Sequence, residues 1–168
     1  AYVPAPKNAC TSIKTALFEL ENGFEFRPYQ INGKHFHIHN FHKSYESISH
    51  SQFGADFLSH SFRFCVVRDP LERIISCYRN RVLKHGELKG TEYEKCADNF
   101  IEFAEALDEI STSVPSIRHH AEKQISFLGN SPDVYTNIYN FQNLSKIVAD
   151  LKECCGSTIT LPHLQKAG

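Results

Sequence analysis

Residues 62–67, FRFCVV, constrain the fold of this 168-residue chain more than any other stretch. The run is rich in β-branched and aromatic residues and lacks a clear polar–apolar alternation, which is the pattern of a strand buried on both faces. Strands of this kind belong to parallel sheets, because each crossover between parallel strands places a helix on one face of the sheet. The rest of the chain therefore has to supply further strands and covering helices.

A helix is predicted directly after this strand, in the stretch RDPLERIISCYRNRVLKH. Asp69 is a natural N-cap, Pro70 suits the first helical position, and Glu72 completes a capping box. Apolar residues follow at helical spacing and are expected to form one buried stripe. That stripe consists of Leu71, Ile74, Ile75, Tyr78 and Val82.

Similar patterns predict strands and helices along the whole chain, which indicates an α/β protein with a three-layer arrangement of a central parallel sheet flanked by helices. A single domain over residues 1–168 is expected, because there is no linker, repeat or low-complexity tract. The further predicted strands are 1–5, 34–39 and 134–141, and the further helices run from Thr11 or Ser12 to Gly23, over 98–112, over 116–128, and from Leu144 to Gly156.

The charge balance excludes one class of partner. The net charge is −1, from 18 Lys and Arg against 19 Asp and Glu, so a broad basic surface for nucleic acid is not indicated. No run approaches the roughly 18 apolar residues of a transmembrane helix, and no signal-like segment is present. Methionine is absent even at position 1, which is what a trimmed or processed chain would show. Methionines left out as non-standard residues would give the same count.

Six cysteines are present, without a CxxC pair or a regular framework. They are expected to be mostly buried or half-buried thiols of a reducing compartment, with disulfides as the alternative. These residues are Cys10, Cys65, Cys77, Cys96, Cys154 and Cys155.

The loop PKNACTS lies between the first predicted strand and helix. The first turn of a helix has free N–H groups and the positive end of the helix dipole, so this loop is suited to bind a phosphate or sulfate. A Walker A loop would need glycines and a lysine just before the hydroxyl residue, whereas here the lysine comes first and no glycine is present. The alternative is an ordinary turn capped by Thr11, with Lys7 in solvent. The residues expected at the anion are Lys7, Asn8, Ala9, Cys10, Thr11 and Ser12.

A second anion site is predicted where the strand over 62–67 ends. Arg68 follows this strand, and its planar guanidinium suits a phosphate. On the next helix, Arg73, Ser76 and Asn80 lie opposite the apolar stripe, and Ser76 can reach the same anion as Arg68. The alternative is that Arg68 pairs with Asp69 or a helix end.

Taken together, PKNACTSIKTAL and RDPLERIISCYRNR resemble the two nucleotide-binding motifs of the sulfotransferases, which use 3′-phosphoadenosine 5′-phosphosulfate (PAPS). The closer similarity is to the carbohydrate branch, in its bacterial and Golgi forms. YNFQNL and LPHLQKAG resemble two further stretches of the family, so the likeness runs from residue 2 to about residue 166. It implies the P-loop-like sulfotransferase fold and transfer of a sulfuryl group to a hydroxyl acceptor, expected to be a glycan.

The resemblance implies roles residue by residue. Lys7, Thr11 and Ser12, with the backbone of residues 8–10, would hold the 5′-phosphosulfate, and Arg68 and Ser76 would hold the 3′-phosphate. PAP would be the product, and no metal is expected. Arg73 matches an arginine whose role in the family is expected to be structural. Three features depart from the family pattern: Gln142 replaces a usual Glu, Gln165 a common Asn, and the chain stops before a last helix that many members have.

The histidines of GKHFHIHNFHKS have three possible roles. His35, His37 and His39 alternate, so on one strand they would share a face. They could bind a metal, form a hydrogen-bonded polar face, or include the base that takes the proton of the acceptor hydroxyl. His39, at the predicted carboxyl end of the strand, is the first choice for the base, followed by His42 and His37. His119 and His120 are expected on a helix surface.

Two other functions compete with sulfuryl transfer. A kinase-like phosphoryl transferase would need Mg²⁺ and a carboxylate at a strand end, but Asp69 is better explained as a helix cap. A non-catalytic nucleotide-binding relative is the second alternative. The acceptor pocket is expected from residues 40–60 and 85–130. The predicted location is the cytoplasm, or the Golgi lumen for a trimmed catalytic domain, and the oligomeric state is left open.

Overall fold

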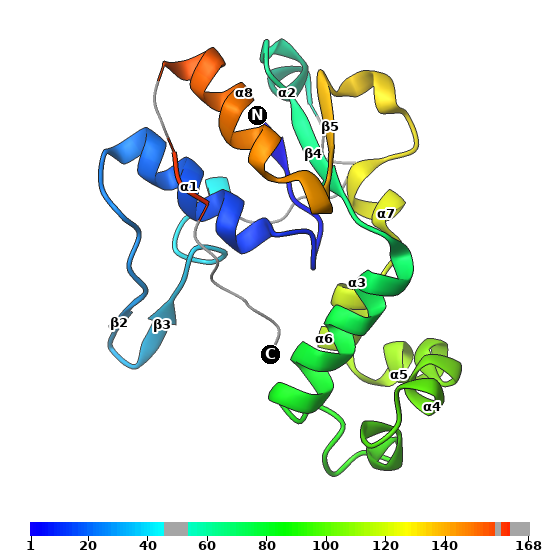
Figure 1. The fold of residues 1–168 in the computed structure, drawn as a ribbon. Helices are drawn as coiled ribbons and strands as arrows, with labels where there is room; N and C mark the ends of the chain where they lie inside the picture. Colours follow the sequence, from blue (N-terminus) through cyan, green and yellow to red (C-terminus); the bar gives the residue numbers. More distant parts are fainter. Residues whose placement is uncertain (46–53, 157–158, 162–168) are drawn as a thin grey trace. The chain divides into compact units, whose positions relative to one another are not determined.

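The computed structural model describes residues 1–45, 54–156 and 159–161. The chain divides into two compact units, one holding residues 1–67 and the residues from Gln124 onward, the other holding residues 68–123 (Figure 1). A single domain over residues 1–168 stays a prediction. No helix in the described part of the chain is both long and apolar enough to cross a membrane.

The first unit is built on a parallel sheet of three strands, β1 (Tyr2–Val3), β4 (Phe64–Val67) and β5 (Asn137–Asn140), in the order β1-β4-β5. Tyr2 pairs with Phe64, and Phe64 in turn with Asn137. The central strand β4 is the apolar run that the sequence singles out, and its residues 64–66 are buried. The predicted parallel sheet is therefore confirmed.

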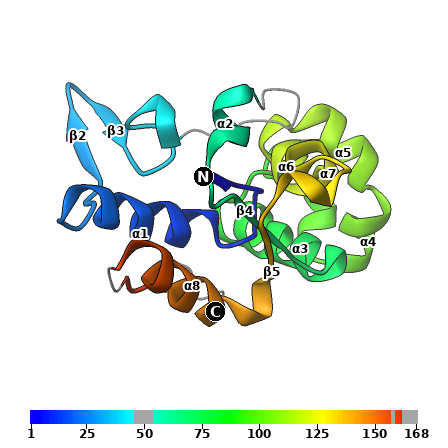
Figure 2. The same cartoon turned by 90° about the horizontal axis from the view of Figure 1, so that it is seen from above.

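Helices cover both faces of this sheet (Figures 1 and 2). Phe64 and Val66 point to one face, where they pack with α1 (Cys10–Asn22) and α8 (Ser145–Cys155). Cys65 points to the other face, toward α2 (Ala55–Ser59) and α7 (Gln124–Leu128). Side chains alternate along a strand, so one continuous apolar run serves both layers. The predicted three-layer α/β architecture is confirmed.

The strand predicted over 34–39 ends earlier than expected. It is β3 (Lys34–Phe36), which pairs antiparallel with β2 (Tyr29–Ile31) in a separate two-stranded sheet. Asn32 and Gly33, both with positive φ, make the turn between the two strands. His37 then begins a turn in which the amides of residues 40 and 41 bond to its carbonyl. The three alternating histidines consequently do not share one strand face.

Short 3₁₀ segments complete the first unit: η1 (Lys43–Tyr45), η5 (Pro132–Val134) and η6 (Phe141–Asn143). Its two longest helices end as predicted. Gly23 after α1 and Gly156 after α8 adopt the left-handed conformation, with φ of 76° and 70°. Glycine tolerates this conformation without a Cβ clash and so stops each helix.

The second unit is helical. α3 (Pro70–Cys77) continues as the π-helical η3 (Tyr78–Lys84), followed by η4 (Glu94–Ala97), α4 (Phe100–Glu105), α5 (Leu107–Ser113) and α6 (Pro115–Ala121). Its core contains Cys77, Tyr78, Val82, Leu88, Phe103, Ile110 and Ile117.

Three predictions in this region are wrong in detail. Leu71 is 61% exposed and does not belong to the buried stripe. The helix predicted over 98–112 is interrupted at Ala106, and the one over 116–128 is two helices, α6 and α7, separated at Glu122. Glu122 leaves the helical conformation, with ψ of 145°, and its carbonyl accepts from Arg73. The hydrogen bond from Arg73 of α3 thus accompanies the break between α6 and α7, and the local spacing of apolar residues does not reveal such a contact.

Candidate functional site

The loop between β1 and α1 has a backbone suited to glycine but contains none. Lys7 and Ala9 have φ of 68° and 60°, in the left-handed region. A residue with a Cβ pays roughly 1 kcal/mol for this conformation, and such strain persists only where the surrounding structure imposes it. Left-handed residues of this kind occur in the backbone concavities that bind anions. The absence of glycine therefore does not make this loop an ordinary turn.

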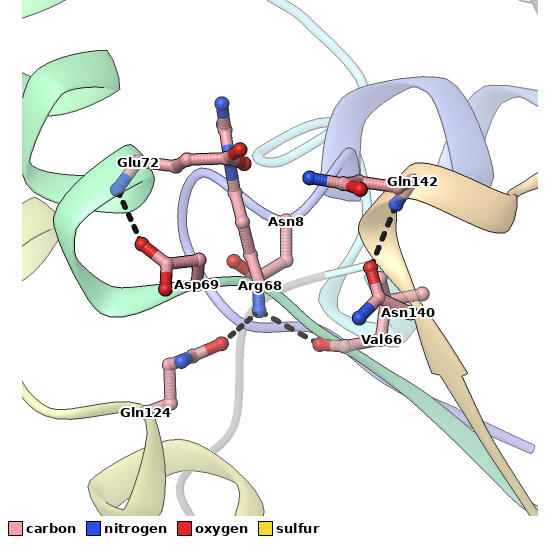
Figure 3. Close-up of polar contacts among 8 residues, drawn as sticks. All are labelled: Asn8, Val66, Arg68, Asp69, Glu72, Gln124, Asn140 and Gln142. Atoms are coloured by element: carbon pink, nitrogen blue, oxygen red, sulfur yellow. Dashed lines mark hydrogen bonds and ion pairs between the residues drawn. The ribbon is translucent and has the colours of Figure 1, made fainter.

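Asn8 holds the loop in this shape (Figure 3). Its side chain is fully buried, and its Nδ2 donates to the carbonyl of Val66 at 2.7 Å and to Oε1 of Gln124 at 2.6 Å. The loop is thus fixed to the end of the central strand and to the start of α7. The sequence predicts Asn8 only as one of the residues at the anion. Its anchoring role depends on contacts with Val66 and Gln124, 58 and 116 positions away in the sequence, which no local pattern signals.

The N-cap residue of α1 provides no side-chain cap. The helix begins at Cys10, slightly earlier than predicted, and Ala9 stands at the N-cap position without a side-chain hydrogen bond. The first turn contains no acidic residue. Thr11 lies inside the helix, so the alternative of a turn capped by Thr11 is wrong. Because the first-turn N–H groups of a helix lack intrahelical partners and its dipole is positive there, the start of this 13-residue helix is suited to bind an anion.

Other predicted loop residues are accessible enough to touch a ligand. Lys7, Cys10, Thr11 and Ser12 are half-buried, and so is Ala9. Only Asn8 of the predicted set is buried.

His39 lies against this loop. Its Nε2 is 2.8 Å from Oγ1 of Thr11, and its Nδ1 is 3.3 Å from Nζ of Lys14. Lys14 is 3% exposed and also donates to the carbonyl of Tyr45. The structure therefore brings the first-choice histidine together with the predicted anion loop, although His39 stands in a turn after β3 rather than on the strand. Sequence reasoning did not consider Lys14.

The other histidines of this segment make local contacts. The Nδ1 atom of His37 accepts from the amide of His39 at 3.2 Å, and that of His42 accepts from the amide of Ser44 at 3.3 Å. His35, on β3, and His42 are exposed. Within the described ranges, no three His, Cys, Asp or Glu side chains gather as a metal site would require.

In the second unit, Arg68 follows directly on β4. Its side chain is 16% exposed, and its Nε lies 3.5 Å from Oε2 of Glu72. Asp69 accepts from the amide of Glu72 at 3.0 Å and so caps α3 as predicted (Figure 3). Ser76 is half-buried, two turns further along the helix. Arg68 and Ser76 belong to this unit and the PKNACTS loop to the other, so joint binding of one nucleotide is part of the proposal below.

Arg73 has the structural role that the resemblance implied. It is 2% exposed, and its Nη2 donates to the carbonyl of His120 at 3.1 Å and to that of Glu122. Burial lowers its pKa from the usual value. His120 is half-buried and contacts Arg81 at 3.0 Å, so it is not the surface residue expected, whereas His119 is exposed.

Three further predictions can be located. Gln142 is exposed at the end of β5, where its amide donates to Oδ1 of Asn140 at 2.9 Å (Figure 3). Gln165 and most of LPHLQKAG lie outside the described residues, as do residues 46–53 of the expected acceptor region.

A pocket of about 210 Å³ is lined mainly by residues of the expected acceptor range 85–130. It is lined by Val82, Gly86, Leu88, Lys89, Glu94, Ala97 and Asp98, none of which is predicted to bind the nucleotide or to act as the base.

The cysteines are thiols of mixed exposure. Cys10 and Cys96 are half-buried and Cys65 and Cys77 buried, as predicted, but Cys154 and Cys155 are exposed at the end of α8.

Comparison with known proteins identifies the family of the chain. No curated protein and no solved structure matches the chain significantly. The model of one family, described as the Sulfotransferase family, matches residues 1–163, which include the β1–α1 loop, β4 with Arg68, and β5. The chain therefore belongs to the sulfotransferase family and is a transferase of sulfuryl groups.

Proposed function

We propose that this chain transfers the sulfuryl group of PAPS to a hydroxyl group of a carbohydrate. The observation that carries the proposal is the β1–α1 loop, in which Lys7 and Ala9 are left-handed and Ala9 leaves the first turn of α1, with Thr11, without an N-cap side chain. These groups offer N–H donors, a hydroxyl and a positive charge to one anion. Family membership adds sulfuryl transfer as the reaction class.

In this proposal the two ends of the nucleotide are bound by different motifs. The β1–α1 loop, with Lys7, Thr11 and Ser12, holds the 5′-phosphosulfate. Arg68 and Ser76 hold the 3′-phosphate, for which a guanidinium directly after a strand is suited. The Glu72 carboxylate beside Arg68 is 41% exposed in its side chain and can move away when a phosphate binds.

The transfer is an in-line displacement at sulfur. The acceptor oxygen forms the new S–O bond while the bond from sulfur to the bridging oxygen of the 5′-phosphate breaks. Negative charge grows on that bridging oxygen, where Lys7 and the N-terminus of α1 stabilise it. The acceptor proton passes to a histidine base, for which His39 and His42 are the candidates.

A thermal-shift titration tests the nucleotide. We expect PAP to raise the melting temperature without Mg²⁺, because a ligand that binds only the folded state stabilises it. ATP with Mg²⁺ should have a smaller effect. A shift with ATP–Mg²⁺ but none with PAP would refute the proposal and favour a kinase-like enzyme.

Lys7→Ala tests the mechanism. Both residues have a Cβ, so the left-handed strain at this position is unchanged while the charge is lost. We expect sulfate transfer from PAPS to decrease by about 10²-fold or more, as for other stabilisers of a developing charge. Lys152→Ala, in the last turn of α8, is the matched control. Normal transfer by Lys7→Ala would contradict the mechanism, and PAP binding without transfer to any sugar would favour a non-catalytic relative.

The acceptor and the cellular location complete the proposal. A carbohydrate acceptor rests on the likeness of the two nucleotide motifs to the carbohydrate branch. The location in the cytoplasm is supported by the free thiols of Cys10, Cys65 and Cys96.

A further inference from the structure

Lys14 is a buried cationic side chain next to the proposed sulfate site. It is 3% exposed on α1, and its Nζ reaches both the carbonyl of Tyr45 and Nδ1 of His39. Lysines are rarely buried to this extent, because the ammonium group loses its hydration unless polar partners replace water. Both partners named here come from the segment after β3 and not from α1 itself. Lys14 therefore links this segment to the helix that carries the anion loop.

The chemistry of the contact decides where the proton of His39 lies. An ammonium group has three donors and no acceptor, so Lys14 can only donate to Nδ1. A neutral imidazole that accepts at Nδ1 carries its proton on Nε2. A second proton on the ring would place two cations 3.3 Å apart, which is unfavourable. His39 is then neutral, with Nε2–H directed at Oγ1 of Thr11, 2.8 Å away.

This arrangement orients the hydroxyl of Thr11. When Nε2–H donates to Oγ1, the hydroxyl proton of Thr11 cannot point back to His39 and is available to another acceptor. Thr11 lies in the first turn of α1, where the N-cap residue Ala9 makes no side-chain hydrogen bond to the helix. The hydroxyl can thus donate to an anion in the β1–α1 loop. Hydrogen bonds in a chain strengthen one another, so the ammonium at its start makes Thr11 a stronger donor.

We infer that Lys14 is a positioning residue that keeps His39 in the Nε2–H form, so that His39 directs the Thr11 hydroxyl toward the sulfate of the bound nucleotide. The inference rests on the proposed function for the identity of the anion. It also changes one role in that function: both ring nitrogens of His39 are engaged, Nε2 by Thr11 and Nδ1 by Lys14, so His42 is the remaining candidate for the base.

The proton position on His39 is measurable without any nucleotide. Nitrogen-15 NMR spectra of the imidazole rings distinguish the two neutral forms, and His39→Gln identifies the signals of His39. We expect the Nε2–H form in the unmodified chain and in Lys14→Arg, which keeps a donor. Lys14→Met should shift His39 toward the Nδ1–H form, whereas Lys146→Met on α8 should not. A proton on Nδ1 in the unmodified chain would overturn the inference, even if Lys14→Met does not fold.

Nucleotide affinity tests the link to Thr11. We expect Lys14→Met to weaken PAP binding about fivefold, the effect of one well-directed hydrogen bond. In a Thr11→Val background the same substitution should have no further effect, because the hydroxyl it orients is gone. Independent losses from Lys14→Met and Thr11→Val would overturn the inference.

The two proposals fail in different ways. If the unmodified chain does not bind PAP, the proposed function is refuted, and the NMR measurement still decides whether Lys14 sets the proton position of His39. If PAP binds but His39 carries its proton on Nδ1, the proposed function stands and the role of Lys14 does not.

Discussion

Two residues of the β1–α1 loop, Lys7 and Ala9, hold a backbone conformation that usually belongs to glycine. A lysine at this place gives the loop a positive charge that glycine could not supply, at the expense of local strain. Ala9 has no such function, since its side chain is a single methyl group. The backbone strain at Ala9 follows from the geometry of the loop, so its effect on stability can be measured separately from sulfate transfer.

Ala9→Gly should stabilise the protein or leave its stability unchanged. Glycine removes the Cβ clash of the left-handed conformation, roughly 1 kcal/mol, against about 0.5–1 kcal/mol for the greater freedom of the unfolded chain. Ala16→Gly, at a buried position within α1, is the matched control and should lose at least about 1 kcal/mol. Urea unfolding gives both values. Equal losses in the two variants would contradict the strain at Ala9.

Asn8→Asp should be strongly destabilising. The carboxylate has the shape of the amide but no donor, so it would face the carbonyl of Val66 with acceptors only, even where the amide of Gln124 turns to donate to it. We expect a loss of about 2–3 kcal/mol or more in the free energy of unfolding at neutral pH. Asn22→Asp removes a bond to the carbonyl of Phe18 at an exposed site and should lose much less. A small effect at Asn8 would mean that the loop does not depend on this anchor.

At the scale of elements, predictions from sequence succeed where the cause is local. The buried strand β4, the Asp69 cap of α3 and the glycine ends of α1 and α8 all follow from a few neighbouring residues. The pair Asn32–Gly33 is an equally local signal for a hairpin turn. The alternating histidines that follow it favour one continuous strand instead. The π-helical η3 and the break before α7 accompany long-range contacts, such as those of Arg73, that spacing does not encode.

The buried and the exposed cysteine thiols should react with a thiol reagent at very different rates. Burial raises the pKa of the Cys65 thiol, on β4, to about 12, so almost no reactive thiolate is present at neutral pH. Cys154 and Cys155 are exposed at the end of α8. We expect a thiol reagent at pH 8 to label Cys154 and Cys155 within minutes and Cys65 only after unfolding. Mass spectrometry of the labelled peptides checks this, and rapid labelling of Cys65 would contradict the burial of β4.

At the scale of the whole molecule, the two predicted phosphate-binding motifs belong to different compact units. The β1–α1 loop lies in the unit that contains the sheet, and Arg68 begins the helical unit directly after β4. The family match covers both units. If the proposed function is correct, one nucleotide must contact both, because PAPS carries a phosphate on each side of its ribose. The contribution of each unit to nucleotide affinity can be measured with a ligand that lacks one of the two phosphates.

Adenosine 5′-phosphate lacks the 3′-phosphate of PAP and provides this comparison. In the unmodified chain we expect PAP to bind at least about tenfold more tightly, the effect of a charged hydrogen bond. Arg68→Ala should abolish most of this preference and leave the affinity for adenosine 5′-phosphate nearly unchanged. Lys7→Ala should weaken both ligands and preserve their ratio, because Lys7 is assigned to the other end of the nucleotide. Titration calorimetry of the three proteins with the two ligands measures the six combinations. A preference for PAP that survives in Arg68→Ala would place the 3′-phosphate elsewhere, and Arg68 would then serve α3 through Glu72 alone.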